Sequence, residues 1–379
     1  MIDRIRSAGK RFAIQTGWAK SGIKIIFINH EETLTGAPGI LFSVAQHFQN
    51  IFGKHRIRVL SIRKGEAHER FINNFDMVYR EDIYPQKNHQ SMTPYKLARN
   101  YLRSLRPKLV YANCVDSHLY VRAAKSLKIP VILHAHELHR GFYNNVRDGH
   151  FNDDGRISDF ASSADYFICP SNEVYNLMSN DYGVKPSLIE VVHEFIDTDA
   201  VRRLSQDPCE PRMSAPLVAG CGAGEDRKGI DRFVEVAHQM PSVNFMWIGN
   251  RHMRLPAIPK NVHITGWVQN PFPLMNQADV FILPSKEDPF PLVVLEAMAL
   301  SKPVITLRES GGSYYAVQDT GIIMQKMDVP EMVSHIQYLI DNPEARSRYG
   351  AKARARVDQE FNHAKGLEQI ENIVRRFLP

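Results

Sequence analysis

The chain is poor in cysteine, and its cysteines do not form a pattern that holds a metal. The four cysteines, Cys114, Cys169, Cys209 and Cys221, are scattered over 379 residues without a CxxC pair. That spacing argues against a zinc ribbon and is typical of a protein from a reducing compartment. A chain of this length buries a core without covalent cross-links, so no disulfide framework is expected.

Long apolar runs are also missing. No stretch reaches the roughly 18 apolar residues that a membrane-spanning helix needs. The start of the chain, MIDRIRSAGKRFAIQTGWAK, is basic and lacks the apolar core of a signal peptide. Its apolar residues Ile2, Ile5, Phe12 and Trp18 suit one face of an irregular amphipathic helix. The sequence leaves two interpretations open, a contact with an anionic membrane surface and a plain terminal extension.

Charge and composition narrow the class of partner. Net charge is +6 and the isoelectric point is about 9.0, which suits nucleic acid, anionic lipid or phosphorylated substrates. The chain has no RNP-like motif, no zinc-finger spacing and no long basic tract, so nucleic acid is not an expected partner. Apolar residues make up 44% and charged residues 23%, as in an ordinary soluble globular protein. A cytoplasmic location follows, with the peripheral membrane face as the alternative for the basic start.

Strand-like runs alternate with helix-like runs along most of the chain. Such βαβ alternation predicts mainly parallel sheets covered by helices on both faces. Helices are expected at Pro38–Gln49, Pro94–Leu105 and Leu119–Leu127, and from Pro330 to Pro379 with a break near Pro343. The strand-like runs are KIIFIN, HRIRVLSI, KLVYAN, PVILHAH, DYFICPS and LIEVV, followed by PLVAGCG, VNFMWIG, NVHITGW, DVFILPS, KPVITL and GIIMQK.

The rhythm breaks once, which predicts two domains. The segment 196–215 is polar and punctuated by proline, as interdomain linkers are. We therefore expect an N-terminal domain over 1–195, in which 1–20 form the basic extension, and a C-terminal domain over 216–360. In open α/β sheets, ligands bind beyond the carboxyl ends of the strands, so the natural site is a cleft between two such domains.

Two loops of the first domain carry candidate site residues. In TGAPG, Gly36 and Ala37 precede a helix whose amino end suits an anion or a sugar hydroxyl, and a plain tight turn fits equally well. In HAHELH, period-two alternation places His134 and His136 on one face, while His139 lies in the loop. No Cys or Asp completes a metal set. We expect His136 to point into the cleft, with a hydrogen-bonded core histidine as the alternative.

The loop GCGAGEDRKGID of the second domain resembles a nucleotide-binding glycine loop. The NAD fingerprint requires glycine at position 225, where the chain has Glu225, so a dehydrogenase is not expected. Arg227 and Lys228 are adjacent cations at the start of a helix. Such a pair suits a diphosphate, because charge and free backbone N–H groups both favour it. A solvated surface pair is the alternative.

The stretch KEDPFPLVVLEAM combines a helix start with two acids. Pro291 can begin a helix, which leaves the N–H groups of Leu292 and Val293 free for a phosphate. Asp288 lies before the helix and Glu296 lies in its second turn. A carboxylate among apolar neighbours is costly unless it has a partner, and vicinal hydroxyls of a ribose or another sugar would supply one. The alternative is a glutamate on a solvated helix face.

Taken together, these motifs resemble a family-4 retaining glycosyltransferase with the two-Rossmann GT-B fold. The resemblance covers essentially the whole chain and is strongest in LPSKEDPFPLVVLEAMALSKPVIT, which is similar to the family's E-x7-E segment. TGAPG, VILHAHEL, RKGID and the pair Gly311-Gly312 also fit. The helical tail fits as well, with 361–379 expected to return toward the first domain.

The resemblance implies roles for the candidate residues. Glu296 would hold the ribose hydroxyls of the donor, and Asp288 with the backbone around Phe290 would hold the transferred sugar. Arg227 and Lys228 would neutralise the diphosphate leaving group. Such enzymes use cations and helix amino ends in place of a metal, so neither a metal nor a cofactor is expected.

By the same resemblance, His136 would contact the sugar near the reacting carbon.

Three departures from the family pattern leave the identity of the donor open. The family's arginine upstream of the clamp lysine is Ala223 here. Glycines around the phenylalanine are replaced by Pro289 and Pro291, which have no N–H to donate. The glutamate after the double glycine is Tyr315.

The expected function is transfer of a sugar from a UDP- or GDP-linked donor to a hydroxyl of a glycan or lipid-linked glycan, with retention of configuration. Two rivals remain. A sugar-nucleotide epimerase would use the same architecture without an external acceptor. A non-catalytic nucleotide-sugar binding protein would keep the site and lack turnover.

Overall fold

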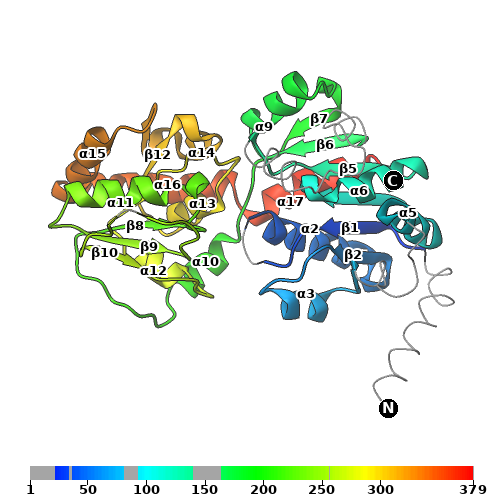
Figure 1. Ribbon diagram of the computed structural model, residues 1–379, viewed down its shortest axis with the longest axis horizontal. Helices are drawn as coiled ribbons and strands as arrows, with labels where there is room; N and C mark the ends of the chain where they lie inside the picture. The colour runs from blue at the N-terminus through cyan, green and yellow to red at the C-terminus, as the bar shows by residue number, and fades with distance from the viewer. Residues whose placement is uncertain (1–21, 34–35, 81–92, 140–163, 256, 379) are drawn as a thin grey trace, which may run out of the picture. The chain divides into compact units, whose positions relative to one another are not determined.

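The computed structural model describes residues 22–33, 36–80, 93–139, 164–255 and 257–378. The predicted basic extension 1–20 lies outside them. The chain divides into two compact units, each built around one sheet (Figure 1). The first unit comprises Met1–Cys169, Val174–Val192 and Leu367–Pro379, and the second comprises Pro170–Glu173 and His193–Gly366.

The first unit contains a parallel sheet in the order β3-β2-β1-β4-β5-β6-β7. Its central strands read as continuous apolar runs because helices cover both of their faces. The strand order reverses between β1 and β4, the position at which α/β sheets open toward a ligand. The strands are β1 Ile25–Asn29, β2 Ile57–Ser61, β3 Met77–Tyr79, β4 Leu109–Asn113, β5 Val131–His134, β6 Tyr166–Cys169 and β7 Ile189–Val191.

Helices of the first unit begin where the sequence provides caps. Thr93 caps α5 with its side chain, Pro94 occupies the first helical position, and Arg106 ends the helix in the left-handed conformation with φ 47°. The helices are α2 Gly36–Phe52, α3 His68–Asn74, α5 Pro94–Leu105, α6 His118–Ser126 and α9 Asn172–Asn176, of which the residues from Val174 onward belong to this unit.

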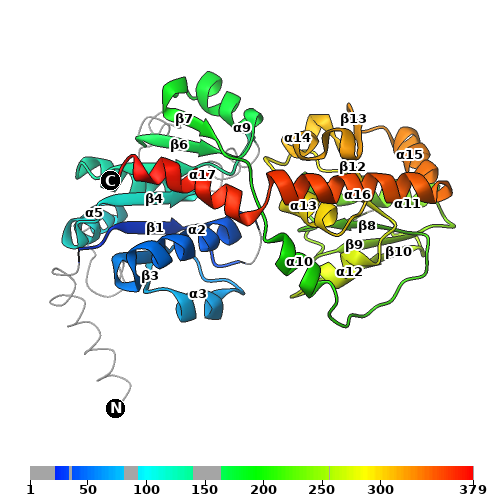
Figure 2. The ribbon, with the colours of Figure 1, turned by 180° about the vertical axis from the view of Figure 1, so that it is seen from behind.

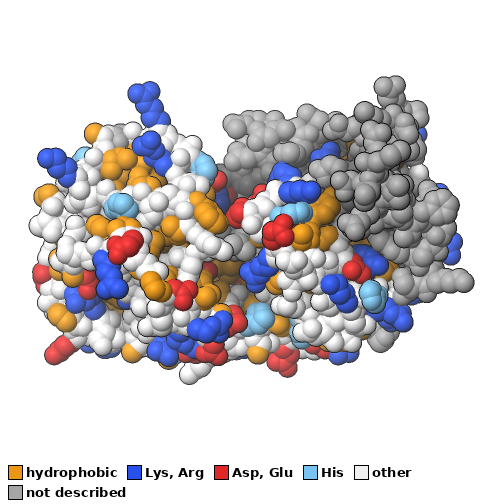
Figure 3. Space-filling model, turned by 90° about the horizontal axis from the view of Figure 1, so that it is seen from below, with side chains coloured by type: hydrophobic (Ala, Val, Ile, Leu, Met, Phe, Trp, Pro, Cys, Tyr) orange, Lys and Arg blue, Asp and Glu red, His pale blue; other side chains and the backbone are white. Residues whose placement is uncertain are grey.

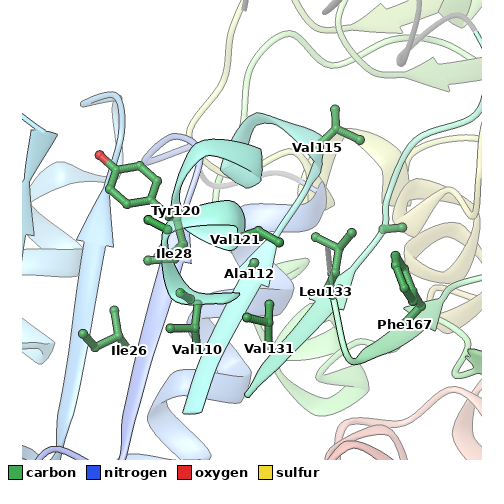
Figure 4. Close-up of a cluster of buried hydrophobic side chains, with 14 of the residues drawn as sticks. Ile26, Ile28, Val110, Ala112, Val115, Tyr120, Val121, Val131, Leu133 and Phe167 are labelled. Carbon is green, nitrogen blue, oxygen red and sulfur yellow. The ribbon is translucent and has the colours of Figure 1, made fainter. Parts of the chain in front are cut away.

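The two faces of the first sheet pack differently. One face buries aliphatic side chains such as Ile28, Ala112 and Leu133 against the helical residues Tyr120 and Val121 (Figure 4). On the other face, Phe27 contacts Tyr111 at 5.3 Å between ring centroids and Phe48 of α2 at 6.3 Å. Each face therefore buries large apolar side chains, which holds the sheet rigid beneath its loops.

The second unit repeats the plan with a parallel sheet in the order β10-β9-β8-β11-β12-β13. Trp247 of β9 is fully buried and packs on Phe233 at 5.3 Å. The strands are β8 Leu217–Cys221, β9 Asn244–Ile248, β10 Val262–Ile264, β11 Val280–Leu283, β12 Val304–Leu307 and β13 Ile322–Met324. The helices are α10 Thr198–Leu204, α11 Ile230–Gln239, α12 Phe272–Asn276, α13 Leu292–Ala299, α14 Ser313–Val317, α15 Val329–Asp341 and α16 Pro343–Glu360.

The tail of the chain ends in α17, His363–Arg375, whose residues from Leu367 onward belong to the first unit (Figure 2). A side chain of α17 and one from the turn after it hold the tail there. Glu371 accepts a hydrogen bond from His47 of α2 at 2.6 Å, and Arg376 forms an ion pair with Glu190 at 2.9 Å. No helix among the described residues is long and apolar enough to cross a bilayer.

The predicted linker at 196–215 is wrong in part, because it contains helix α10 and belongs to the second unit. Asp197 caps this helix by accepting a hydrogen bond from the Ala200 N–H at 2.9 Å, and Val201 is buried. The polar composition of this segment is typical of a linker, although the segment forms a short amphipathic helix. Strand β3 was also not predicted, because its three apolar residues stand between the charged Asp76 and Arg80 and not in a longer apolar run.

Helix α10 provides a test of this correction. Replacing Asp197 with alanine removes the cap and should lower the free energy of unfolding by about 1 kcal/mol. Asp199→Ala is the matched control, because Asp199 makes only a surface ion pair with Arg202 and should cost no more than about 0.5 kcal/mol. Urea denaturation followed by tryptophan fluorescence measures both. Equal losses of unfolding free energy in the two variants would show that the Asp197 cap does not stabilise α10.

Candidate functional site

Two loops meet at the point where the strand order of the second sheet reverses. The first follows β8 and the second follows β11, and these strands are neighbours although β9 and β10 lie between them in the chain. The Lys286 N–H donates to the Arg227 carbonyl at 2.8 Å. Gly229 has φ +74°, and a Cβ there would lie 2.1 Å from the Pro284 carbonyl oxygen. The two loops are thus packed backbone to backbone.

The close approach joins two of the predicted site residues. Lys228 Nζ lies 2.6 Å from Asp288 Oδ2, and both side chains are largely buried, at 17% and 5% exposure. The Asp288 backbone is held as well, since its N–H donates to Ser310 and its carbonyl accepts from Gly312. The ion pair therefore has a fixed position above the ends of β8 and β11. Lys228 and Asp288 had been assigned to different parts of a ligand, and the structure brings them into direct contact.

Arg227 remains the accessible cation of the site. Its guanidinium donates to the Glu287 carbonyl at 3.2 Å and makes no ion pair with any described residue. Lys286, by contrast, is paired with Asp226 and, at 2.7 Å, with Asp231. The site therefore combines one uncompensated positive charge with one lysine that shares its charge with a carboxylate. An anion would find its strongest attraction at Arg227.

Helix α13 begins directly after this loop, as predicted from Pro291. Within the described part of the chain, the N–H groups of Leu292 and Val293 donate to no acceptor. Unsatisfied N–H groups at a helix start carry partial positive charge. Leu292, Val293 and Glu296 are also the less buried positions of α13, and their spacing places them on one helix face.

Glu296 is the unusual residue of that face. Its carboxyl group is partly buried and makes no hydrogen bond or ion pair with the described residues. Burial raises the pKa of Glu296 to about 7. Burial raises the pKa of the neighbouring Cys221 thiol. The charges of Glu296 and Lys228 also act on this pKa, as smaller effects. The carboxylate thus lies near the end of β8 without a partner, as the sequence had suggested.

Phe290 is held by a cluster of aromatic side chains. It is buried and stacks on His193 with centroids 5.0 Å apart, and it contacts Phe361 at 5.6 Å. Tyr315 lies 4.1 Å from His193 in the same cluster. This packing explains why Phe290 is a fixed point of the loop, and it gives Tyr315 a structural role in place of the family's glutamate.

Sequence reasoning missed this aromatic cluster, and it noted the loop after β12 only through the pair Gly311-Gly312 and Tyr315. A Cβ at Gly312 would lie 2.2 Å from the Pro289 carbonyl oxygen, so the double glycine permits a close approach to the proline-framed loop. The pair Gly311-Gly312 was the available signal. His193 gave no signal, because nothing in the sequence indicates which aromatic residues it will contact.

The candidate residues of the first unit lie at the carboxyl edge of its sheet. Gly36 begins α2 with φ +53°, and a Cβ there would meet no atom within 4 Å, so its conformation and not close packing favours glycine. Ala37 follows it. His136 follows β5, and its ring lies 4.0 Å from that of His134, which confirms the shared face.

His134 is the core histidine of this pair. Its Nδ1 lies 2.9 Å from the Tyr111 hydroxyl, and burial with the nearby charge of His136 lowers its pKa well below the usual value. His139 is exposed and pairs with Asp181 at 3.4 Å, away from the two. His136 is therefore the half-buried histidine of HAHELH beside that core histidine, at the carboxyl edge of the first sheet.

Comparisons with known proteins identify the class. The family model described as "Glycosyltransferase Family 4" matches residues 34–200, and "Glycosyl transferases group 1" matches residues 215–342. Fold and family models together define a glycosyltransferase with two parallel α/β sheets. The chain belongs to the group 1, family-4 glycosyltransferases.

Relatives and solved structures agree with that assignment. A lipopolysaccharide core biosynthesis glycosyltransferase of Rhizobium meliloti is 22% identical over 55% of this chain and 65% of its own length. A processive diacylglycerol alpha-glucosyltransferase of Acholeplasma laidlawii is 28% identical over 52% of this chain and 64% of its own length. The matched regions thus span less than two thirds of these relatives.

Among solved structures, HepE of Anabaena in complex with UDP and glucose superposes with a TM-score of 0.75 at 16% identity, covering 93% of this chain and all of that one. WaaG, involved in lipopolysaccharide biosynthesis, superposes with a TM-score of 0.67 at 15% identity, covering 92% of this chain and 99% of that one. At these identities the likeness shows the GT-B fold.

Gly229 tests the packing of the two loops. Gly229→Ala should lower the free energy of unfolding by about 2–4 kcal/mol, since it adds overpacking against backbone to the cost of a left-handed residue. The matched control Gly266→Ala has the same φ of +74° but meets only a side-chain atom, at 3.7 Å. It should cost about 1 kcal/mol. Equal losses in urea denaturation would refute the close approach.

The raised pKa of Glu296 predicts a pH dependence of stability. The folded state favours the neutral carboxyl, so stability is lost as pH rises from the unfolded value of 4.5 through about 7. Glu296→Gln should be more stable than wild type at pH 8 by about 1–2 kcal/mol, and equal to it at pH 4. Glu235→Gln, exposed on α11, serves as control. A Glu296→Gln variant less stable at pH 8 would contradict the prediction.

Proposed function

We propose that this protein is a retaining glycosyltransferase that moves a hexose from a UDP- or GDP-linked donor to a hydroxyl of a glycan or lipid-linked glycan. The observation that carries the proposal is the grouping at the switch point of the second sheet. Arg227 and the pair Lys228–Asp288 belong to the loops after β8 and β11, and the second loop leads into α13, whose Glu296 has no partner among the described residues. Cations, free N–H groups and a lone carboxylate together suit a nucleoside diphosphate sugar.

The diphosphate has a natural position at this site. Arg227 carries an uncompensated charge, and the N–H groups of Leu292 and Val293 have no acceptor among the described residues. A phosphate there would gain charge-assisted hydrogen bonds from both. Lys228 would then be shared between the phosphate and Asp288, which keeps the lysine in place before the donor arrives.

A donor also satisfies Glu296. Two vicinal hydroxyls of a ribose can donate together to one carboxylate, and those hydrogen bonds favour the ionised form. Donor binding would therefore lower the pKa that burial raises in the free protein. Asp288 and the backbone around Phe290 are then left for the transferred sugar, with His136 of the first unit as a further proposed contact.

The proposed chemistry follows from what the site supplies. As the bond between the sugar and the diphosphate breaks, negative charge grows on the leaving phosphate, and Arg227, Lys228 and the start of α13 stabilise it. The acceptor hydroxyl attacks from the same face, and a phosphate oxygen of the leaving group takes its proton, so configuration is retained. Asp288 is tied to Lys228 and is not assigned the role of a covalent nucleophile.

No metal has a role in this proposal, because side-chain cations and a helix start supply the positive charge. The donor and acceptor classes find support in relatives. One structural neighbour is a complex with UDP-glucose, and sequence relatives are named for lipopolysaccharide core and capsular polysaccharide biosynthesis. Such acceptors agree with a cytoplasmic enzyme that works at the membrane face.

A thermal-shift panel of UDP-, GDP-, ADP- and CMP-sugars tests the donor. A ligand that binds the folded state alone raises the melting temperature, by mass action equivalent to about 2.7 kcal/mol at one hundred times its dissociation constant. UDP- or GDP-sugars should produce the shift in wild type. Glu296→Gln should need at least tenfold more ligand to reach the same melting-temperature shift, while the variant stays folded.

The control for this panel is Glu235→Gln, which should respond as wild type does. A shift with every nucleotide sugar but no transfer to any glycan or lipid acceptor would indicate a binding protein. Conversion of the donor without an acceptor would indicate an epimerase. No shift with any compound would contradict the proposed function, and an inverted anomeric centre in the product would contradict retention.

A further inference from the structure

The amino edge of the first sheet, opposite to the edge that carries Gly36 and His136, is strongly basic. The loops that enter β2, β4 and β5 and the last turn of α5 all end at this edge, because parallel strands begin on one side (Figures 1 and 2). Within the described residues, six of its side chains are exposed cations that make no ion pair. They are Lys54, Arg56, Arg103, Arg106, Lys108 and Lys128.

The described acids that enter strands at the same edge are already neutralised. Asp76, which precedes β3, lies 2.5 Å from Arg58, and Asp165, which precedes β6, is paired with Lys125. The six cations therefore keep their charge. Adjacent strands lie about 4.8 Å apart, so the entries of β2, β1, β4 and β5 place these charges within a band on the order of 15 Å wide. We refer to the six residues as the basic edge.

Apolar side chains accompany the charge. Ile51, in the last turn of α2, is 38% exposed, and the partly buried Phe52 beside it contacts Lys24 at 5.8 Å from Nζ to ring centroid. Lys54 and Arg56 follow immediately in the chain. Exposed aliphatic and aromatic groups next to cations are typical of surfaces that enter the boundary between headgroups and acyl chains.

The start of the chain joins the molecule at this edge. Gly22 precedes β1, and its carbonyl accepts a hydrogen bond from Arg56 at 3.2 Å, which fixes the point of attachment. By sequence, the residues before it bring five more cations and the single acid Asp3. On the face of the molecule in Figure 3, by contrast, basic and acidic side chains are interspersed.

We propose that the basic edge docks this protein on an anionic phospholipid membrane. The cations attract the negative leaflet, and Ile51 with Phe52 enters the interface. Nucleic acid would also attract the cations, but its phosphate backbone has no apolar surface against which the exposed Ile51 could be buried. Docking requires no turnover, so this inference does not depend on the proposed function.

Flotation of the full chain with lipid vesicles tests the proposal. We expect binding to phosphatidylcholine vesicles that contain about one third phosphatidylglycerol, weak binding to phosphatidylcholine alone, and loss of binding as salt rises. The test variant changes Lys54, Arg56, Arg106 and Lys108 to Gln. The control variant removes the same charge from exposed cations of the second unit, by changing Arg203, Lys326, Arg348 and Lys365 to Gln.

The test variant should bind the anionic vesicles at least tenfold more weakly, and the control variant should stay within twofold of wild type. Equal loss in the two would show that net charge alone matters and would overturn the proposal. So would unchanged binding of the test variant together with complete loss on deletion of residues 1–20, because the basic edge would then be dispensable. Unaltered melting temperatures and donor shifts show that the variants are folded.

Ile51→Ser separates lipid from nucleic acid. It should weaken vesicle binding severalfold, and it should leave unchanged any retention on a DNA duplex, which depends on charge alone. Tighter binding of wild type to the duplex than to the anionic vesicles, with no effect of Ile51→Ser on either, would overturn the proposal in favour of nucleic acid.

Discussion

The candidate site depends on one backbone contact, in which Gly229 lies against the Pro284 carbonyl oxygen. No side chain fits at that position, since even a Cβ would come within 2.1 Å of the oxygen. The contact brings the turn after β8 onto the end of β11. Lys228 then reaches Asp288, and the Arg227 carbonyl accepts from Lys286. A glycine and a parallel pair of strands thus set the geometry of every charge at the site.

Close to that contact, α13 carries one residue that is unfavourable for stability. Glu296 is a carboxyl group that loses water without gaining a partner in the part of the chain that the structure describes, and its raised pKa reflects that cost. The rest of α13 is apolar and well buried, with Val294, Leu295 and Met298 in the core. Such packing holds the helix in place despite the carboxyl group. An unfavourable residue on a well-supported helix is what a ligand site requires, because the ligand then supplies the missing partner.

The first sheet separates two kinds of surface by the direction of its strands. At the carboxyl edge, His136 and the start of α2 are neighbours of buried polar groups such as the Tyr111–His134 pair. At the amino edge the loops are exposed and basic. Because all strands run the same way, residues that enter strands and residues that leave them are held a strand length apart. The fold therefore keeps the candidate site residues of the first unit and its basic loops on separate edges.

The sequence by itself determined the two sheets, nearly all their strands, and the helix start at Pro291, because buried parallel strands are continuous apolar runs and prolines mark helix ends. It also singled out Glu296, since a carboxylate among aliphatic residues is conspicuous. It failed at α10, whose sequence is largely polar, and at β3, whose three apolar residues are bounded by charged ones. Only the tertiary structure decided that Lys228 pairs with Asp288, that Phe290 stacks on His193, and that the basic loops share one edge. Those facts depend on contacts between residues far apart in the chain, which no local pattern records.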